Sequence, residues 1–369
     1  MRAGHGAVAD RSARTSLVEA TDWTASAWDD VAARSPKGDA FQSYAWGELK
    51  RGLGWRPLRY VVELDGRAVA AVSIQERPLP GARGPLGRYR IHYAPHGPIL
   101  MAAEPEAVAA ALDGLRRIAA LRHAVVLTMD PTWEEGSGPA TALSAAGFRV
   151  ATRDVQVSRT AMIVPLRPSE EAQRELLGHT TGYDIKRAES AGVVTERVDM
   201  TDGPGRDAAL ADFYEMHAAT GRREGFIVRD RDYELEQWRR LGESGLASLW
   251  FAGLAGRDTG ALLLHSGSLL VYFAAGSRDG ADLRRTRANH LLQWRIIRWA
   301  AAAGFEGYDM GGVDTQAAPG IPQDESHPLW NLYLFKHRFG GVPVVRIHAH
   351  EYVPSAALGL AWRLVRRVR

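Results

Sequence analysis

The sequence contains no cysteine among its 369 residues. Disulfides, thiolate nucleophiles and zinc–sulfur sites are therefore excluded. The 12 histidines form no HExxH motif, so no metal site of that type is supported. The chain also lacks a GxSxG elbow, a Walker P-loop and a GxGxxG fingerprint, which are the motifs of serine hydrolases, P-loop nucleotide hydrolases and dinucleotide-dependent enzymes.

Long apolar runs are missing too. No run reaches eighteen apolar residues, so we expect no transmembrane helix. Residues 1–16 are small, polar and basic without a continuous apolar stretch, which predicts a disordered leader and not a secretion signal. The lack of cysteine is compatible with a cytoplasmic location. A formal charge of +3 and a pI near 9.2 permit contact with nucleic acid, phosphates or anionic lipid but require none.

The length of the chain favours two domains, because single cores rarely grow beyond about 250–300 residues. The same order of elements occurs twice in the sequence: a hairpin, a strand, a helix, and a strand with an aspartate at its end. The two copies cover residues 58–76, 90–100, 104–122 and 124–130, and then 246–264, 268–275, 288–303 and 307–310. This pattern predicts an α/β (α+β) protein with two copies of one domain and a pocket along or between them.

A helical section between the two copies is rich in arginine. Arg222, Arg223, Arg229 and Arg231 fall within ten residues, and Tyr233 follows. Guanidinium groups bind phosphate and carboxylate oxygens in pairs, and a phenol adds a donor. The alternative is a solvated helix edge with ion pairs to neighbouring acids. Apolar residues within the segment favour a loop that is held against the protein.

Other candidate residues have equally plain alternatives. Lys336 precedes a Phe-Gly-Gly turn and is either a site cation or a surface lysine. Either Trp46 and Lys50 both face a ligand, or Trp46 is an anchor of the core. Asp130 and Asp309 are either bases at strand ends or caps of the turns that follow, and capping is favoured for Asp309 because two glycines follow it.

The end of the chain has its own pattern. Residues 356–369 place apolar side chains on one helical face and arginines on the other. This pattern is typical of a basic interfacial helix, and equally of a last helix that packs on the first domain.

Nine segments in order resemble the Fem family, the aminoacyl-tRNA-dependent peptidyltransferases that build peptidoglycan bridges. They lie within residues 41–352 and include FQSYAWGELK, YAPHGPIL, YDIKRAESAGV, FYEMHAATGRREGFIVRDRDY, LLQWRIIRWAAAAGFEGYDMGG and LFKHRFGG. The resemblance implies two tandem GNAT (acyl-CoA N-acyltransferase)-like domains. We therefore expect domain 1 at 17–165 plus 350–369 and domain 2 at 166–349. We see no charged heptad hairpin in domain 2, so we expect no long coiled-coil arm.

The resemblance also implies a reaction. An amino acid moves from aminoacyl-tRNA to an amine of a peptidoglycan precursor stem peptide, carried either by UDP-MurNAc-pentapeptide or by lipid II. No metal or coenzyme is needed, because the ester is already activated. The enzyme would work in the cytoplasm, with peripheral contact at the inner face of the plasma membrane through residues 356–369.

Site residues follow from the same resemblance. Lys336, which follows Phe335, looks like the cation that stabilises the oxyanion. Arg229, Tyr233 and Lys50 resemble ligands of the precursor diphosphate, and Trp46 lies beside Lys50. Asp130 is similar to an acid proposed as a base, and Tyr272 resembles an aromatic residue that lines the peptide channel.

Departures from the family pattern keep other functions open. Gly182 precedes Tyr183 where the family has an arginine, His96 stands in the loop that usually reads PRGP, and Asn289-His290 replaces Pro-Tyr. They motivate a second reading, aminoacyl-tRNA-dependent peptide-bond formation in natural-product biosynthesis. A third, an acyl-CoA-dependent N-acyltransferase, ranks lower because the pyrophosphate loop is missing after Ser277. The fourth is a non-enzymatic muropeptide-binding module.

Overall fold

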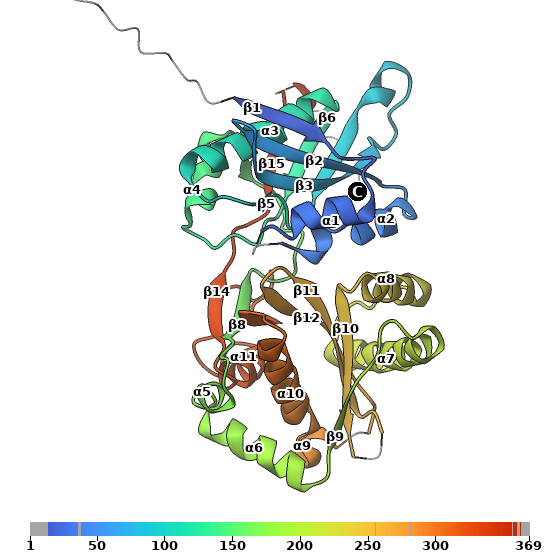
Figure 1. Ribbon diagram of the computed structural model, residues 1–369, viewed down its shortest axis with the longest axis vertical. Coiled ribbons are helices and arrows are strands. Elements are labelled where there is room, and N and C mark those ends of the chain that lie inside the picture. Colours follow the sequence, from blue (N-terminus) through green and yellow to red (C-terminus); the bar gives the residue numbers. More distant parts are fainter. Residues whose placement is uncertain are drawn as a thin grey trace, which may run out of the picture.

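The protein folds as two α/β domains, stacked along the long axis of the molecule (Figure 1). The structure is a computed structural model and describes residues 14–35, 38–254, 256–280, 282–355, 357–359 and 362. Each domain is built on one twisted sheet with helices on both faces.

The first sheet has the strand order β1-β2-β3-β4-β6-β15-β7, with β5 paired to β3. Its strands are β1 (Thr15–Glu19), β2 (Arg56–Leu64), β3 (Arg67–Pro78), β4 (Arg90–Ala94), β5 (Ile99–Leu100), β6 (Ala124–Met129), β7 (Arg149–Val150) and β15 (His350–Tyr352). Its helices are α1 (Ala25–Ala32), η1 (Ala40–Gln42), α2 (Tyr44–Arg51), η2 (Gly84–Arg88), α3 (Pro105–Leu121) and α4 (Gly138–Ala145).

The second sheet has the order β14-β8-β13-β12-β11-β10-β9. Its strands are β8 (Thr160–Pro165), β9 (Val194–Arg197), β10 (Ala247–Gly253), β11 (Thr259–Ser266), β12 (Leu269–Ser277), β13 (Gly307–Gly312) and β14 (Val342–Val345). Its helices are α5 (Glu170–Arg174), α6 (His179–Ser190), α7 (Gly203–Glu224), α8 (Arg231–Glu243), α9 (Leu283–Thr286), α10 (Ala288–Ala302) and α11 (Trp330–His337).

The internal repeat predicted from the sequence is present in the strand pairing. The β2–β3 and β10–β11 hairpins are antiparallel, while β4 pairs in parallel with β6 and β12 pairs in parallel with β13. The first hairpin turns at Asp65 and Gly66, whose φ angles of 51° and 77° suit this tight turn. Asp130 directly follows β6, whereas Asp309 lies within β13.

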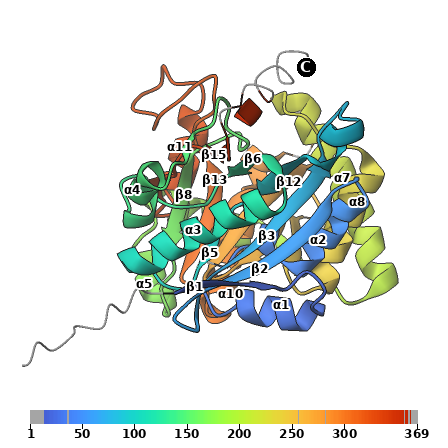
Figure 2. The same ribbon diagram turned by 90° about the horizontal axis from the view of Figure 1, so that it is seen from above.

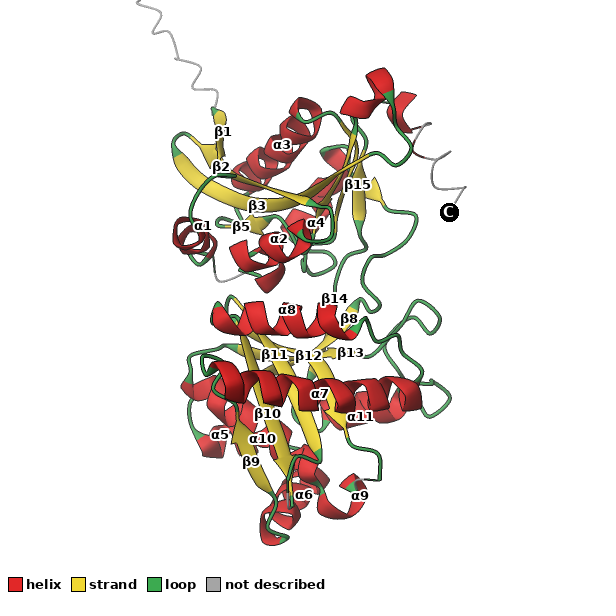
Figure 3. Ribbon diagram, turned by 90° about the vertical axis from the view of Figure 1, so that its right-hand side faces the viewer, coloured by secondary structure: helices red, strands yellow, loops and turns green. Residues whose placement is uncertain are grey.

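Helices cover both faces of each sheet. In the first domain α3 packs on one face around Leu115, and α1 packs on the other through Trp28. Figure 2 shows α3 lying across the strands. In the second domain α6 and α10 cover one face, and α7 and α8 cover the other. Figure 3 shows α2 of the first domain directly above α8 of the second.

Two expected domain boundaries need correction. We expected domain 1 to run to residue 165, but β8 pairs with β13 and β14 in the second sheet, so the change of domain lies before Thr160. We expected the leader to end at residue 16, but Thr15 and Ser16 already pair with β2. β15 returns to the first sheet, where it lies between β6 and β7.

The remaining expectations concern helices and termini. The pair α7 and α8, of 22 and 13 residues, packs on the second sheet, and no long coiled-coil arm is present in the described ranges. None of the described helices is long and apolar enough to cross a membrane. Residues 1–13 and most of 356–369 lie outside the described residues, so the leader and the interfacial helix stay predictions.

Candidate active site

The two domains meet through η1 and α2 on one side and α8, β11 and β12 on the other. Ala40 and Trp46 pack with Leu241 and Leu264 in an apolar cluster that spans both domains. A hydrogen bond also joins the domains here, since the Ala40 N–H donates to the Ser266 hydroxyl at 3.2 Å. The Ser43 hydroxyl caps α2 by accepting from the Trp46 N–H, which fixes the start of the helix that carries Lys50.

Lys50 lies at this interface and contacts a residue of the second domain. Its Nζ donates to the Tyr233 hydroxyl at 2.6 Å and lies 4.1 Å from the centre of the Trp46 ring. The Arg229 guanidinium lies 5.7 Å from the centre of the Tyr233 ring. Burial, and then the nearby charge of Arg229, lower the pKa of Lys50 to about 8. The structure thus brings together four residues predicted from the sequence.

The rest of the arginine segment has a different role from the one predicted. Arg222 and Arg223 pair with Asp279, at 3.9 and 2.8 Å, and Arg231 lies 3.7 Å from Glu215. These three arginines form exposed ion pairs, as in the alternative, but the acids Asp279 and Glu215 lie outside the arginine segment. Arg229 forms no ion pair with any described residue, which leaves its guanidinium available for an anion.

Trp46 packs in the apolar interface cluster, and its indole N–H lacks a hydrogen-bond acceptor among the described residues. Its side chain is 7% exposed within the interface cluster, and its ring lies against Phe41 at 4.3 Å. The buried indole Nε1 has no acceptor among the described residues. Since a buried indole N–H usually finds a partner, this donor is an unsatisfied polar group within the interface.

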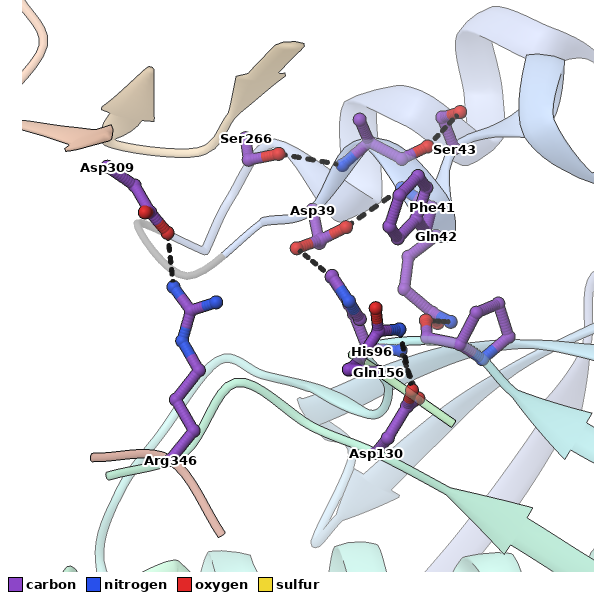
Figure 4. Close-up of polar contacts among 12 residues, drawn as sticks. Asp39, Phe41, Gln42, Ser43, His96, Asp130, Gln156, Ser266, Asp309 and Arg346 are labelled. Atoms are coloured by element: carbon purple, nitrogen blue, oxygen red, sulfur yellow. Dashed lines mark hydrogen bonds and ion pairs between the residues drawn. The ribbon is translucent and has the colours of Figure 1, made fainter. Parts of the chain in front are cut away.

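Asp130 is embedded in a network of donors, shown in part in Figure 4. Its carboxylate accepts from the Tyr93 hydroxyl at 2.8 Å and from the His96 N–H and Gln156 Nε2, both at 2.9 Å. Burial raises the pKa of Asp130, although these donors and the His96 charge oppose that effect. With three donors on its oxygens, Asp130 has little capacity left for a substrate amine, so positioning fits its geometry better than proton abstraction.

His96 connects Asp130 to the domain interface. Its Nδ1 lies 2.9 Å from the Asp39 Oδ2, and the other oxygen of Asp39 caps η1 by accepting from the Phe41 N–H at 2.8 Å (Figure 4). Burial disfavours the imidazolium, but the carboxylates of Asp39 and Asp130 outweigh it and raise the pKa of His96. The family departure at this position therefore holds a titratable group between two acids.

Lys336 lies on the buried side of α11 and is only 5% exposed. Its Nζ donates to the Gly312 carbonyl at 2.7 Å, next to the turn that Gly311 makes with a φ of 82°. A Cβ added at Gly311 would lie 3.6 Å from Nζ, so the absence of a side chain there leaves room at the ammonium group. Burial lowers the pKa of Lys336 to about 8, and Asp309 opposes this effect.

Phe335 and Tyr272 pack against the core of the second domain. The Phe335 ring packs against His290 and Phe339, both with ring centres 5.2 Å away, and lines a cavity of about 210 Å³ that also contains Asp184. Tyr272 packs against Tyr308 in the core of the second domain, and its backbone carbonyl adjoins Gly311.

A second cavity, of about 370 Å³, is lined by Asp212, Arg257 and Arg278. Neither cavity is lined by Lys50 or Lys336.

Several site residues were missed in the sequence, namely Asp39, Tyr93, Gln156 and Arg346. One available signal was the rarity of lysine. Only four of the 46 Lys and Arg residues are lysines, and two of these four are Lys50 and Lys336. In an arginine-rich chain each of the few lysines is a candidate for a site that needs a compact ammonium, although exposed Lys186 shows that rarity alone assigns no role.

Metal ligation gains no support from the geometry. Within the described part of the chain, no group of three or more His, Asp or Glu side chains could hold a metal ion.

These observations define a protein of two tandem GNAT-like domains, with Lys50 at the domain interface and Lys336 buried in the second domain. Residues 179–318 match the acetyltransferase (GNAT) domain family. Over 92% of its length the chain is 22% identical to the lipid II:glycine glycyltransferase of Staphylococcus aureus (strain MRSA252), covering 93% of that protein.

Among solved structures, the crystal structure of FemX superposes with a TM-score of 0.77 at 21% identity, covering 95% of this chain and 99% of that one. A conserved protein of unknown function from Bacteroides thetaiotaomicron superposes with a TM-score of 0.54 at 10% identity, over 90% and 97% of the two chains. The resemblance to the Fem proteins seen in the sequence is therefore confirmed, and so is the tandem GNAT-like fold.

Proposed function

We propose that this protein is an aminoacyltransferase that moves an amino acid from aminoacyl-tRNA to an amine of a peptidoglycan precursor stem peptide. The observation that carries the proposal is similarity over nearly the whole chain to a lipid II:glycine glycyltransferase. Half-buried Lys50 and buried Lys336 support it, because acyl transfer to an amine needs an anion-binding group for the precursor and a cation for the oxyanion.

The first lysine suits the anchoring of the precursor. Lys50, Tyr233 and Arg229 together present an ammonium, a hydroxyl and a guanidinium beside the interface. Two cations and a hydroxyl donor suit the oxygens of a diphosphate, which is common to nucleotide-linked and lipid-linked precursors.

The second lysine suits the chemical step. The neutral amine of the stem peptide attacks the ester carbonyl, and the electrons of the C=O bond move to oxygen. The Lys336 ammonium, which uses one of its three donors on Gly312, has two left for this oxyanion. When the tetrahedral intermediate collapses, the C–O bond to the tRNA ribose breaks, the ribose oxygen takes up the proton from the amine, and an amide remains.

The test is an assay that offers both donors and both acceptors. The purified protein receives a mixture of charged tRNAs or acetyl-CoA as donor, and UDP-MurNAc-pentapeptide or lipid II as acceptor, with mass spectrometry of the products. We expect a stem peptide extended by one amino acid only with charged tRNA. Acetylated product would support the acyl-CoA alternative, and the absence of product from all four combinations would contradict the proposal.

Aminoacyl-tRNA-dependent peptide-bond formation in natural-product biosynthesis is the second candidate. It is favoured by His96 and His290, which depart from the family pattern and both occupy packed positions, one in the Asp130 network and one in the 210 Å³ cavity. Transfer to free peptide amines, with no transfer to either cell-wall precursor, would distinguish it from the first.

A further inference from the structure

A buried ion pair lies beside Lys336 and plays no part in the reaction described above. Asp309 is 1% exposed, and its Oδ2 accepts from the Arg346 guanidinium at 2.6 Å (Figure 4). Its other oxygen, Oδ1, accepts from the Gly311 N–H at 2.8 Å. Both oxygens of this carboxylate are thus occupied by groups other than the lysine.

Lys336 lies over the same turn without pairing with Asp309. Its Nζ bonds to the carbonyl of Gly312, the residue after Gly311. No carboxylate of the described residues lies within 4.0 Å of this nitrogen, although Asp309 is near enough for its charge to act on the lysine. A buried ammonium this close to a carboxylate would ordinarily close an ion pair.

The backbone that carries Arg346 is fixed independently of its side chain. Arg346 belongs to the segment that runs from β14 back to the first domain, and its N–H donates to the Arg159 carbonyl at 2.9 Å. The Arg159 Nε donates to the Arg346 carbonyl at 3.0 Å, and Arg346 forms an isolated bridge with Glu134. Substitution of the Arg346 side chain therefore leaves these backbone bonds in place.

We propose that Arg346 is a positioning residue for Lys336, because it holds and neutralises the Asp309 carboxylate so that the ammonium stays unpaired. A lysine that pairs with a carboxylate has its charge compensated before the reaction begins, and it stabilises a developing anion less. Arg346 supplies the compensating charge instead. This role deepens the proposed function, since the anion in question is the oxyanion of acyl transfer, but the coupling among the three side chains exists without it.

The proposal predicts opposite effects for two substitutions. Arg346→Gln frees Asp309 to pair with Lys336, which should raise the pKa of the lysine by about one unit or more. Asp309→Asn removes the carboxylate whose charge acts on Lys336, while the amide oxygen still accepts from Gly311, which should lower that pKa. Arg346→Lys keeps the charge and should remain close to the unsubstituted protein. The phenols of Tyr272 and Tyr308 also pack near this turn, and both stay neutral because burial raises their pKa.

The pKa of Lys336 can be measured without any assay of activity. The full-length protein is labelled briefly with acetic anhydride at a series of pH values, and peptide mass spectrometry gives the rate at each lysine. The chain has only four lysines, so the signals are resolved, and exposed Lys186 serves as the internal reference. We expect the midpoint at Lys336 to move up in R346Q, down in D309N and little in R346K. An unchanged midpoint in R346Q, or shifts of the same sign in R346Q and D309N, would overturn the proposal.

A second measurement separates this proposal from the proposed function. If charged tRNA supports transfer, R346Q should lower kcat near neutral pH and move the alkaline limb of the pH–rate profile upward, with the precursor Kd unchanged. Opposite labelling shifts without any transfer would leave the coupling intact and reject the proposed function. If transfer occurs but the labelling midpoint of Lys336 is the same in R346Q as in the unsubstituted protein, only the coupling is rejected. Each variant is measured separately, so failure of one to fold still leaves the other as a test.

Discussion

Replacing Lys50 by methionine is the most direct test of the diphosphate site. Burial and Arg229 lower the pKa of Lys50 from 10.5 to about 8, which corresponds to about 3 kcal/mol by which the site disfavours the charged amine. A phosphate next to the ammonium offsets part of this, since a hydrogen bond to a charged group contributes about 1.5–3 kcal/mol. Lys50 keeps partial contact with water, so we expect the lower part of that range, about 10- to 30-fold weaker binding in K50M.

The assay is calorimetric titration with UDP-MurNAc-pentapeptide at several pH values. Because the free lysine loses its proton above pH 8, the affinity of the unsubstituted protein should be highest below pH 8 and fall at higher pH, whereas K50M should lose this dependence. Arg51→Met is the matched control, since Arg51 is the next residue of α2 but is exposed and paired with Glu48. Equal affinities of K50M and R51M, or an unchanged pH dependence in K50M, would refute the reasoning.

Three further predictions concern catalysis and stability. Lys336→Met should lower kcat by about 100- to 1,000-fold and leave the precursor Kd within twofold. The control Lys186→Met, at an exposed position, should change neither value. A weaker precursor Kd in K336M would show that Lys336 anchors the precursor instead. His96→Gln should lower the free energy of unfolding, measured by urea titration, most at low pH. The raised folded-state pKa of His96 gives a stabilising contribution that is complete below about pH 6.5 and is lost as the pH rises through the folded-state pKa. A difference between variant and unsubstituted protein that stays constant from pH 5 to 9 would exclude this. Trp28→Phe should lower the free energy of unfolding by about 1–3 kcal/mol, because the buried Gln42 carbonyl loses its donor, and a loss below about 0.5 kcal/mol would show that water replaces it.

Much of the fold could be predicted because its signals are local. The Asp65-Gly66 turn and the stop of α10 near Gly304 depend on neighbouring residues. The boundary before β8 could not be predicted, because the pairing of that strand with β13 and β14 is set by residues that lie well over a hundred positions later.

The site could be predicted only as far as a family pattern reaches. The contact between Lys50 and Tyr233 joins residues 183 positions apart, and no periodicity indicates it. Arginine density alone was misleading, because Arg223 pairs with Asp279, 56 positions away. Whether a cation is free or compensated depends on such distant partners, and the same holds for the pair of Asp309 and Arg346.

The position of β15 has a consequence for the order in which the molecule is completed. On a ribosome, residues 160–345 supply every strand of the second sheet before His350 emerges, so that domain can close first. The first domain, although begun earlier, keeps β6 and β7 without a shared neighbour until its last strand arrives. A chain truncated just before residue 350 should therefore hold a protease-resistant second half and a first half that is still readily cleaved.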